Sequence, residues 1–154
     1  MRNIGGLGLS MGGEVLLRAA SQYPLLTAIV ADGATRRSIE EVTALPTERS
    51  LVRNFTARVM YATVRLLSGA EPPLPLMNSM EEANRTQFFF IAAGSDALEV
   101  QFNQLFAKNL GGRASLWVVP EVSHTSAFER YGDAYEKYVI DFFDHNFPSI
   151  SSSE

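Results

Sequence analysis

The stretch IGGLGLSMGGEVLLRAA, residues 4–20, decides the fold of this chain. It begins with a short glycine-rich apolar segment and continues into a run of mostly apolar, helix-forming residues. This pattern predicts a strand over Arg2–Leu9 followed by a helix over Met11–Gln22. The helix carries apolar side chains almost all round, which is typical of a buried helix. Ser10 therefore stands at the carboxyl end of a strand, where the chain turns into a helix.

The rest of the chain continues this alternation. Compact apolar runs at Leu26–Ala31, Gln87–Ala93 and Ala114–Val119 have the length of buried strands. Leu98–Leu110 and the segment Tyr135–Phe147 carry apolar residues at helical spacing. Strands that alternate with helices predict an α/β fold, with a parallel sheet and helices on both faces.

Residues 34–86 differ in character and read as an inserted helical cap. Ser38 and Glu41 have the spacing of a capping box, which predicts the start of a short helix. Apolar residues then recur at helical spacing over Leu51–Leu67, with arginines among them. The proline-rich stretch GAEPPLPLMNSM, Gly69–Met80, reads as an ordered linker.

Composition narrows the class of protein. The chain has 154 residues, of which 46% are hydrophobic and 19% charged, as in an ordinary globular domain. A net charge of −4 offers no basic surface for nucleic acid. There is no cysteine, which excludes disulfides, thiolate metal sites and cysteine nucleophiles. No apolar run approaches the ~20 residues of a membrane span. The sequence indicates no compartment, and its start does not have the pattern of a signal peptide.

Ser10 is the candidate nucleophile. It lies in GLSMG, which fits the pattern G-x-S-x-G between a predicted strand and helix. In that setting the glycines relieve crowding at a sharp turn, and the serine hydroxyl is held out at the carboxyl edge of the sheet. The backbone N–H of the following residue, Met11, can then donate to an oxyanion. The alternative is a glycine-rich strand–helix turn in which the serine has no chemical role.

A base must take the proton of the serine hydroxyl before it becomes a good nucleophile, and an acid must orient that base. The chain has two histidines. His145 follows Phe142 and Phe143, which face the core, so we expect it at the surface. His124 lies in a loop of small polar residues directly after a strand and before the last helix, which favours it as the base.

Three carboxylates compete for the role of the acid. Asp96 directly follows the strand that ends at Ala93, and it is the first choice. It can also serve as the N-cap of the helix that begins near Leu98. Asp32 ends the preceding strand and Glu99 lies inside the helix, and both stay open as alternatives. The chain order Ser…Asp/Glu…His occurs in one large class of hydrolases.

Three segments together resemble the carboxyl-terminal half of an α/β-hydrolase. IGGLGLSMGGEVLLRAA resembles the nucleophile elbow, FFFIAAGSD the acid-bearing strand and turn, and LWVVPEVSHTSAFERYGDAYEKYVIDFFDHNF the strand, histidine loop and final helix. The similarity is closest to dienelactone-hydrolase-like and serine-peptidase-like esterases. It implies a hydrolase core at residues 1–148 with the cap insertion at about 34–86. Residues 149–154 are expected to form a disordered tail.

The resemblance implies a serine hydrolase that cleaves a carboxylic ester or amide through an acyl-enzyme. Ser10 would be the nucleophile, Asp96 the acid, His124 the base, and the Met11 backbone N–H one oxyanion donor. No cofactor and no metal are implied. The substrate would be a small ester or amide, with an apolar portion facing the apolar cap. For the arginine-bearing cap helix, a lid over the substrate is favoured over a place on a membrane surface.

The resemblance also implies a missing part. The family carries roughly half of its sheet before the elbow, including the loop that supplies the second oxyanion donor. Without that part, the strand before Ser10 is an exposed edge of a kind that is normally buried. We therefore expect a homodimer or aggregate, or completion by an amino-terminal half. The alternatives to an active enzyme are a truncated, non-catalytic or partner-completed protein, and a natural start further upstream.

Overall fold

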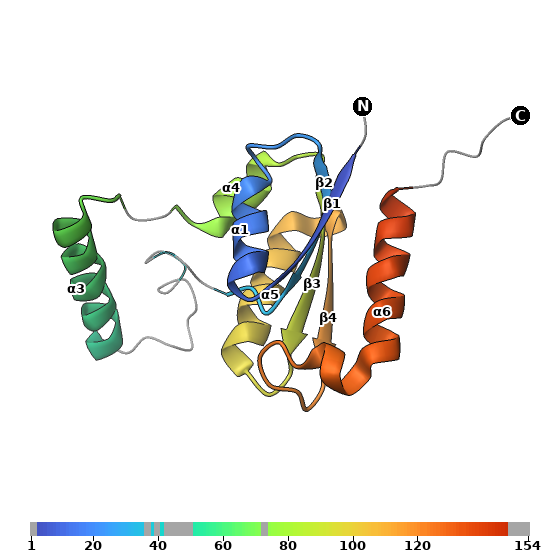
Figure 1. The fold of residues 1–154 in the computed structure, drawn as a ribbon. Coiled ribbons are helices and arrows are strands. Elements are labelled where there is room, and N and C mark those ends of the chain that lie inside the picture. Colours follow the sequence, from blue (N-terminus) through green and yellow to red (C-terminus); the bar gives the residue numbers. More distant parts are fainter. Residues whose placement is uncertain (1–2, 36–37, 39–40, 42–50, 72–73, 148–154) are drawn as a thin grey trace, which may run out of the picture.

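The computed structural model describes residues 3–35, 38, 41, 51–71 and 74–147. In these residues the chain forms a four-stranded sheet with helices on both faces (Figure 1). The strands lie in the order of the sequence: β1 (Ile4–Leu9), β2 (Leu26–Asp32), β3 (Gln87–Ala93) and β4 (Ala114–Val119). Each neighbouring pair is parallel, so all the strands end at the same edge of the sheet. The α/β class predicted from the alternation of elements is confirmed.

One face of the sheet is covered by α1 (Met11–Ala19), α4 (Leu76–Glu82) and α5 (Ala97–Leu110), and the other by α6 (Ala127–Asn146). Strand side chains alternate between the two faces. Phe88 and Phe90 of β3 therefore join the core under α5, whereas Phe89 and Ile91 join the core under α6. The central strands β2 and β3 are buried almost throughout because both of their faces are covered.

The segment expected to form the cap is divided between the core and the exterior. Ser38 and Glu41 exchange the two hydrogen bonds of the predicted capping box. The linker predicted over Gly69–Met80 is wrong in its last part, because α4 begins at Leu76. Leu76 and Met80, one helical turn apart, put their side chains into the core beside α1 and α5.

The helix α3 (Leu51–Ser68) has the helical structure that its periodicity predicts, but it stands away from the sheet (Figure 1). Among the described residues it makes no extended contact with another element. None of the helices in the described part of the chain is long and apolar enough to span a membrane. The predicted tail, 149–154, lies outside the described residues.

The strand β1 lies at one side of the sheet and pairs with β2 alone within the described residues. Its Ile4, Leu7 and Leu9 side chains are exposed. β1 thus has an apolar, glycine-rich sequence, as a buried strand would, and an outer edge without a partner strand in the residues described.

Candidate active site

The turn at Ser10 is tight because glycines let the strand and the helix approach closely. A Cβ on Gly8 would lie 2.5 Å from the backbone of Gly12 and Gly13, and one on Gly13 would lie 2.9 Å from the Gly8 oxygen. Ser10 itself has a φ of 49°, a backbone conformation that residues other than glycine rarely adopt. Its backbone N–H donates to the Asp32 carbonyl at 2.7 Å, which fixes the turn to the end of β2.

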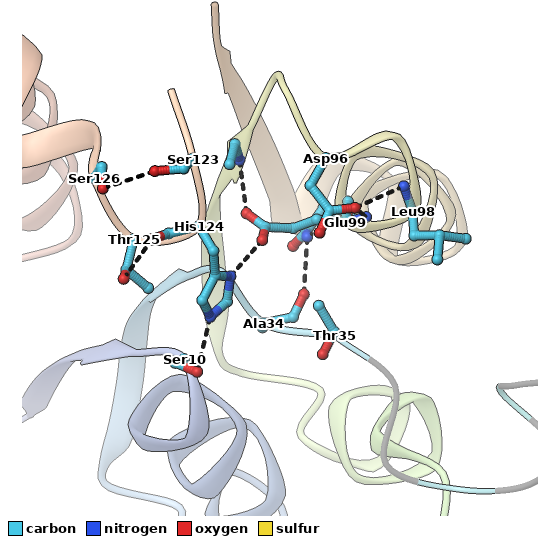
Figure 2. A network of polar contacts seen from close by, with 12 residues as sticks. Ser10, Ala34, Thr35, Asp96, Leu98, Glu99, Ser123, His124, Thr125 and Ser126 are labelled. Atoms are coloured by element: carbon cyan, nitrogen blue, oxygen red, sulfur yellow. Dashed lines mark hydrogen bonds and ion pairs between the residues drawn. The ribbon is translucent and has the colours of Figure 1, made fainter. Parts of the chain in front are cut away.

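Ser10 is the first member of a chain of hydrogen bonds through His124 to Glu99 (Figure 2). The Ser10 Oγ lies 2.9 Å from His124 Nε2. On the other side of the ring, Nδ1 lies 2.6 Å from Glu99 Oε2. Because an ionised carboxylate can only accept, Nδ1 carries the proton and donates to Glu99, which leaves Nε2 to accept from the serine. These three residues come from the ends of β1 and β4 and from α5.

Glu99 is fixed as well as buried. Its side chain is 0% exposed, whereas that of His124 is 43% exposed. The second carboxylate oxygen, Oε1, accepts from the Ala93 backbone N–H at 2.6 Å. A buried carboxylate with both oxygens bonded has a single orientation, so it can hold the imidazole in one position.

The structure does not bring Asp96, the first choice for the acid, to His124. Its Oδ1 accepts from the backbone N–H groups of Leu98 at 3.0 Å and Glu99 at 3.1 Å, so Asp96 is the N-cap of α5. The cause is local: a short side chain at the N-cap turns back onto the first turn of its own helix. Glu99, one turn further and one methylene longer, reaches the imidazole instead.

Asp32, the other alternative for the acid, is buried, and its carboxylate does not hydrogen-bond to His124 but to a residue of α6. Its Oδ2 accepts from the Tyr135 hydroxyl at 3.1 Å. Burial raises the pKa of Asp32 to about 6; the Tyr135 hydrogen bond opposes this rise, the Glu99 charge adds to it and the His124 charge opposes it. Burial and the nearby Asp32 charge also raise the pKa of Tyr135.

The remaining sequence predictions concern Met11 and His145. Met11 is the first residue of α1, and the N–H groups of a first turn have no partner within their helix. Its N–H is thus free of a partner within α1, and its role as an oxyanion donor stays a prediction. His145 is exposed on α6, as predicted.

His124 lies in the loop after β4, and the residues next to it are held by an unusual backbone conformation and by hydrogen bonds. Thr125 has a φ of 59°, unusual for a β-branched residue, and its Oγ1 donates to the His124 carbonyl at 2.7 Å. The hydroxyls of Ser123 and Ser126 lie 3.1 Å apart across the same turn. These hydroxyl-bearing residues are also the sequence feature that predicts a loop around His124.

Two residues that support the site were missed by sequence reasoning. Gly33 has a φ of 72°, and a Cβ there would lie 2.7 Å from His124 Cε1, so the imidazole packs against bare backbone. Asn103 is buried in α5, and its Nδ2 donates to the Ala34 carbonyl at 2.9 Å and the Glu99 carbonyl at 2.8 Å. Gly33 follows a predicted strand without any motif of its own, and a single Asn inside a helix carries no sequence signal.

An apolar hollow in the described part of the chain lies away from Ser10 and His124. It has a volume of about 550 Å³ and lies between β4 and α6, lined by Phe89, Trp117, Tyr138 and Phe142 among others. Neither Ser10 nor His124 lines it. The hydroxyl of Ser10 therefore faces the carboxyl edge of the sheet and not this hollow.

The fold has counterparts among solved structures. An esterase of Pyrococcus furiosus, Pf2001, is 22% identical over 94% of this chain and 54% of its own, with a TM-score of 0.60. The α/β hydrolase GrgF from a Penicillium species is 17% identical, with 92% and 63% of the two chains covered and a TM-score of 0.63. The dienelactone hydrolase of Anabaena variabilis is 21% identical, with 93% and 49% covered and a TM-score of 0.54.

The fold is that of a partial α/β-hydrolase. The chain spans about half the length of the esterase and the dienelactone hydrolase that it matches. No protein-family model matches it, and no curated protein matches its sequence.

Proposed function

We propose that this chain carries the nucleophile, base and acid of a serine hydrolase that cleaves a carboxylic ester or amide. The observation that carries the proposal is the chain of short contacts from Ser10 Oγ to His124 Nε2 and from Nδ1 to buried Glu99. A serine, an imidazole and a carboxylate in this order are the parts that acyl transfer needs. Glu99 takes the role that the sequence had assigned first to Asp96.

The first half of the reaction forms the acyl-enzyme. Ser10 Oγ attacks the substrate carbonyl carbon while His124 Nε2 takes the hydroxyl proton. The Glu99 carboxylate accepts from Nδ1–H throughout and stabilises the imidazolium. The Met11 backbone N–H donates to the oxyanion. As the tetrahedral intermediate collapses, Nε2 gives its proton to the departing alcohol or amine.

The second half releases the acid. A water molecule loses a proton to His124 Nε2 and attacks the acyl carbon, and the Ser10 oxygen leaves with the proton that Nε2 returns. Every proton in the cycle passes through one imidazole nitrogen. An ester is favoured over an amide, because the solved structures of this fold include an esterase and a dienelactone hydrolase by name.

An activity-based fluorophosphonate probe tests the proposal. Such a probe phosphonylates a serine only where a base activates its hydroxyl. Labelling of the full chain is expected at Ser10 and is lost in Ser10→Ala. Ser115→Ala, which removes an exposed hydroxyl from β4 and none from the contacts of the site, is the matched control and keeps labelling. An unlabelled chain that is folded by circular dichroism contradicts the proposal.

A second proposal concerns the outer edge of β1. We propose that this edge receives a strand from a complementary half-domain or from a second copy of the chain. The exposed Ile4 and Leu7 support it, as does a match to only about half of the related structures. One oxyanion donor is worth about 10²–10³ in turnover, so a partner that supplies one would raise activity by that order. Light scattering that gives a clean monomer with full activity rejects this second proposal.

A further inference from the structure

A second carboxylate lies beside the Ser10–His124–Glu99 chain. Asp32 ends β2, and its backbone carbonyl accepts the Ser10 N–H at 2.7 Å. The next residue, Gly33, touches the imidazole: a Cβ on it would lie 2.7 Å from His124 Cε1 and 3.0 Å from Nδ1. The Asp32 side chain is almost entirely buried. Backbone contacts thus place the end of β2 next to Ser10 and His124, and Asp32 is the acidic residue at that end.

The Asp32 carboxylate is bonded by a residue of α6, the helix on the face of the sheet that α5 does not cover. Tyr135, a buried residue of α6, donates its hydroxyl to Oδ2 at 3.1 Å. The titratable groups that act on Asp32 come from each element around it: Tyr135 from α6, Glu99 from α5 and His124 from the loop after β4. Asp32 is therefore part of a cluster of ionisable side chains and not an isolated buried acid.

The charges in this cluster act on one another in both directions. A protonated His124 favours the ionised form of Asp32, whereas the Glu99 charge disfavours it. Linkage makes the first effect reciprocal, so an ionised Asp32 favours the protonated form of His124 by the same free energy. Since burial raises the pKa of Asp32 only to about 6, this carboxylate is mostly charged at neutral pH.

We propose that Asp32 is a positioning residue of the hydrolase, which, held by Tyr135, supplies a second negative charge near the His124 imidazolium. The inference rests on the proposed function. Asp32 exchanges no proton with the substrate. The proton still moves from Ser10 Oγ to His124 Nε2, and Asp32 together with Glu99 stabilises the charge that this transfer creates.

The two histidines make a direct test possible. The imidazole Cε1–H signals of His124 and His145 are followed by NMR during a pH titration of the full chain, with assignment from His145→Gln. In Asp32→Asn the acceptor for Tyr135 remains and the charge is removed. The pH at which His124 is half-titrated should be measurably lower than in the unmodified chain, as expected for the loss of a nearby opposite charge. His145, exposed near the other end of α6, should not change.

Tyr135→Phe is the second variant, and it keeps the proposal falsifiable if Asp32→Asn does not fold. It removes the hydrogen bond that favours the ionised carboxylate, so Asp32 becomes charged at a higher pH. The half-titration of His124 should then fall by less than in Asp32→Asn. An unchanged His124 titration in either folded variant overturns the proposal.

Ester hydrolysis and probe labelling together distinguish a failure of the role of Asp32 from a failure of the proposed function on which it rests. With a p-nitrophenyl ester, Asp32→Asn should lower kcat and leave KM unchanged, because the charge acts on the imidazolium and not on bound substrate. Fluorophosphonate labelling of Ser10 with no shift of His124 rejects the role of Asp32 alone. A shifted His124 in a chain that no probe labels rejects the hydrolase itself.

Discussion

Two regions of this molecule have similarly apolar sequences and opposite surroundings. Phe88, Phe90 and Phe106 in the core are at most 1% exposed, whereas Leu66 and Leu67 of α3 are 84% and 82% exposed. The core residues belong to one buried cluster that joins β2 and β3 to α1, α4 and α5. The apolar pattern of the sequence predicts the secondary structure equally well in both regions, but it does not show whether another element covers the apolar side chains.

The largest expected effect is on stability, and it tests the contrast directly. Phe106→Ala should cost about 3–5 kcal/mol of unfolding free energy, because it leaves a cavity between Phe90 and Phe102. Leu67→Ala should change it by less than about 0.5 kcal/mol. Urea denaturation of the two variants measures both. A similar loss in each would mean that α3 is packed against something in solution.

Within the packed region, the two carboxylates at the start of α5 should behave differently. Glu99→Gln should lower kcat/KM by roughly 10³-fold or more, because the imidazolium loses its buried counter-charge. Asp96→Asn should leave it nearly unchanged, since Asn caps a helix as well as Asp does. Ester hydrolysis by the matched pair gives the answer. A larger loss in Asp96→Asn would restore the first choice made from the sequence.

The buried carboxyl group of Asp32 should make the free energy of unfolding depend on pH. The folded-state pKa, about 6, lies above the ordinary value of 3.8, so the folded chain binds more protons between these two pH values. The contribution to stability is complete below about pH 4 and is lost as the pH rises through 6. Asp32→Asn removes this loss, which is on the order of 3 kcal/mol. Urea midpoints at pH 4 and pH 7 that differ equally in both proteins would contradict it.

The smallest expected effect is at Gly33. An alanine there would adopt a φ of 72° and press its Cβ against His124 Cε1. The strained backbone should cost about 1–2 kcal/mol, and the displaced imidazole should slow fluorophosphonate labelling about tenfold. Gly112→Ala, whose Cβ would meet nothing within 4 Å, is the matched control. Equal labelling rates would show that the imidazole can move aside.

Local sequence was enough for the framework and for predicting two of the residues that the structure brings together, Ser10 and His124. Alternating apolar runs predicted the parallel sheet, and such a sheet gathers the carboxyl ends of its strands at one edge. Ser10 follows from glycines at fixed offsets around a strand–helix turn. His124 and His145 separate because one is in a polar loop and the other is beside core-facing aromatics. All of these features are periodicities or turns within a few residues.

Only the tertiary structure decided between the carboxylates. Asp96, Glu99 and Asp32 all lie near strand ends, and the choice depends on which side chain can reach an imidazole from another element. Glu99 reaches His124 while Asp96 caps its own helix and Asp32 bonds Tyr135, 103 residues away along the chain. Gly33 and α4 likewise take their roles from neighbours far away in sequence. Distances of a few ångströms between elements decide such contacts, and no local pattern of residues contains them.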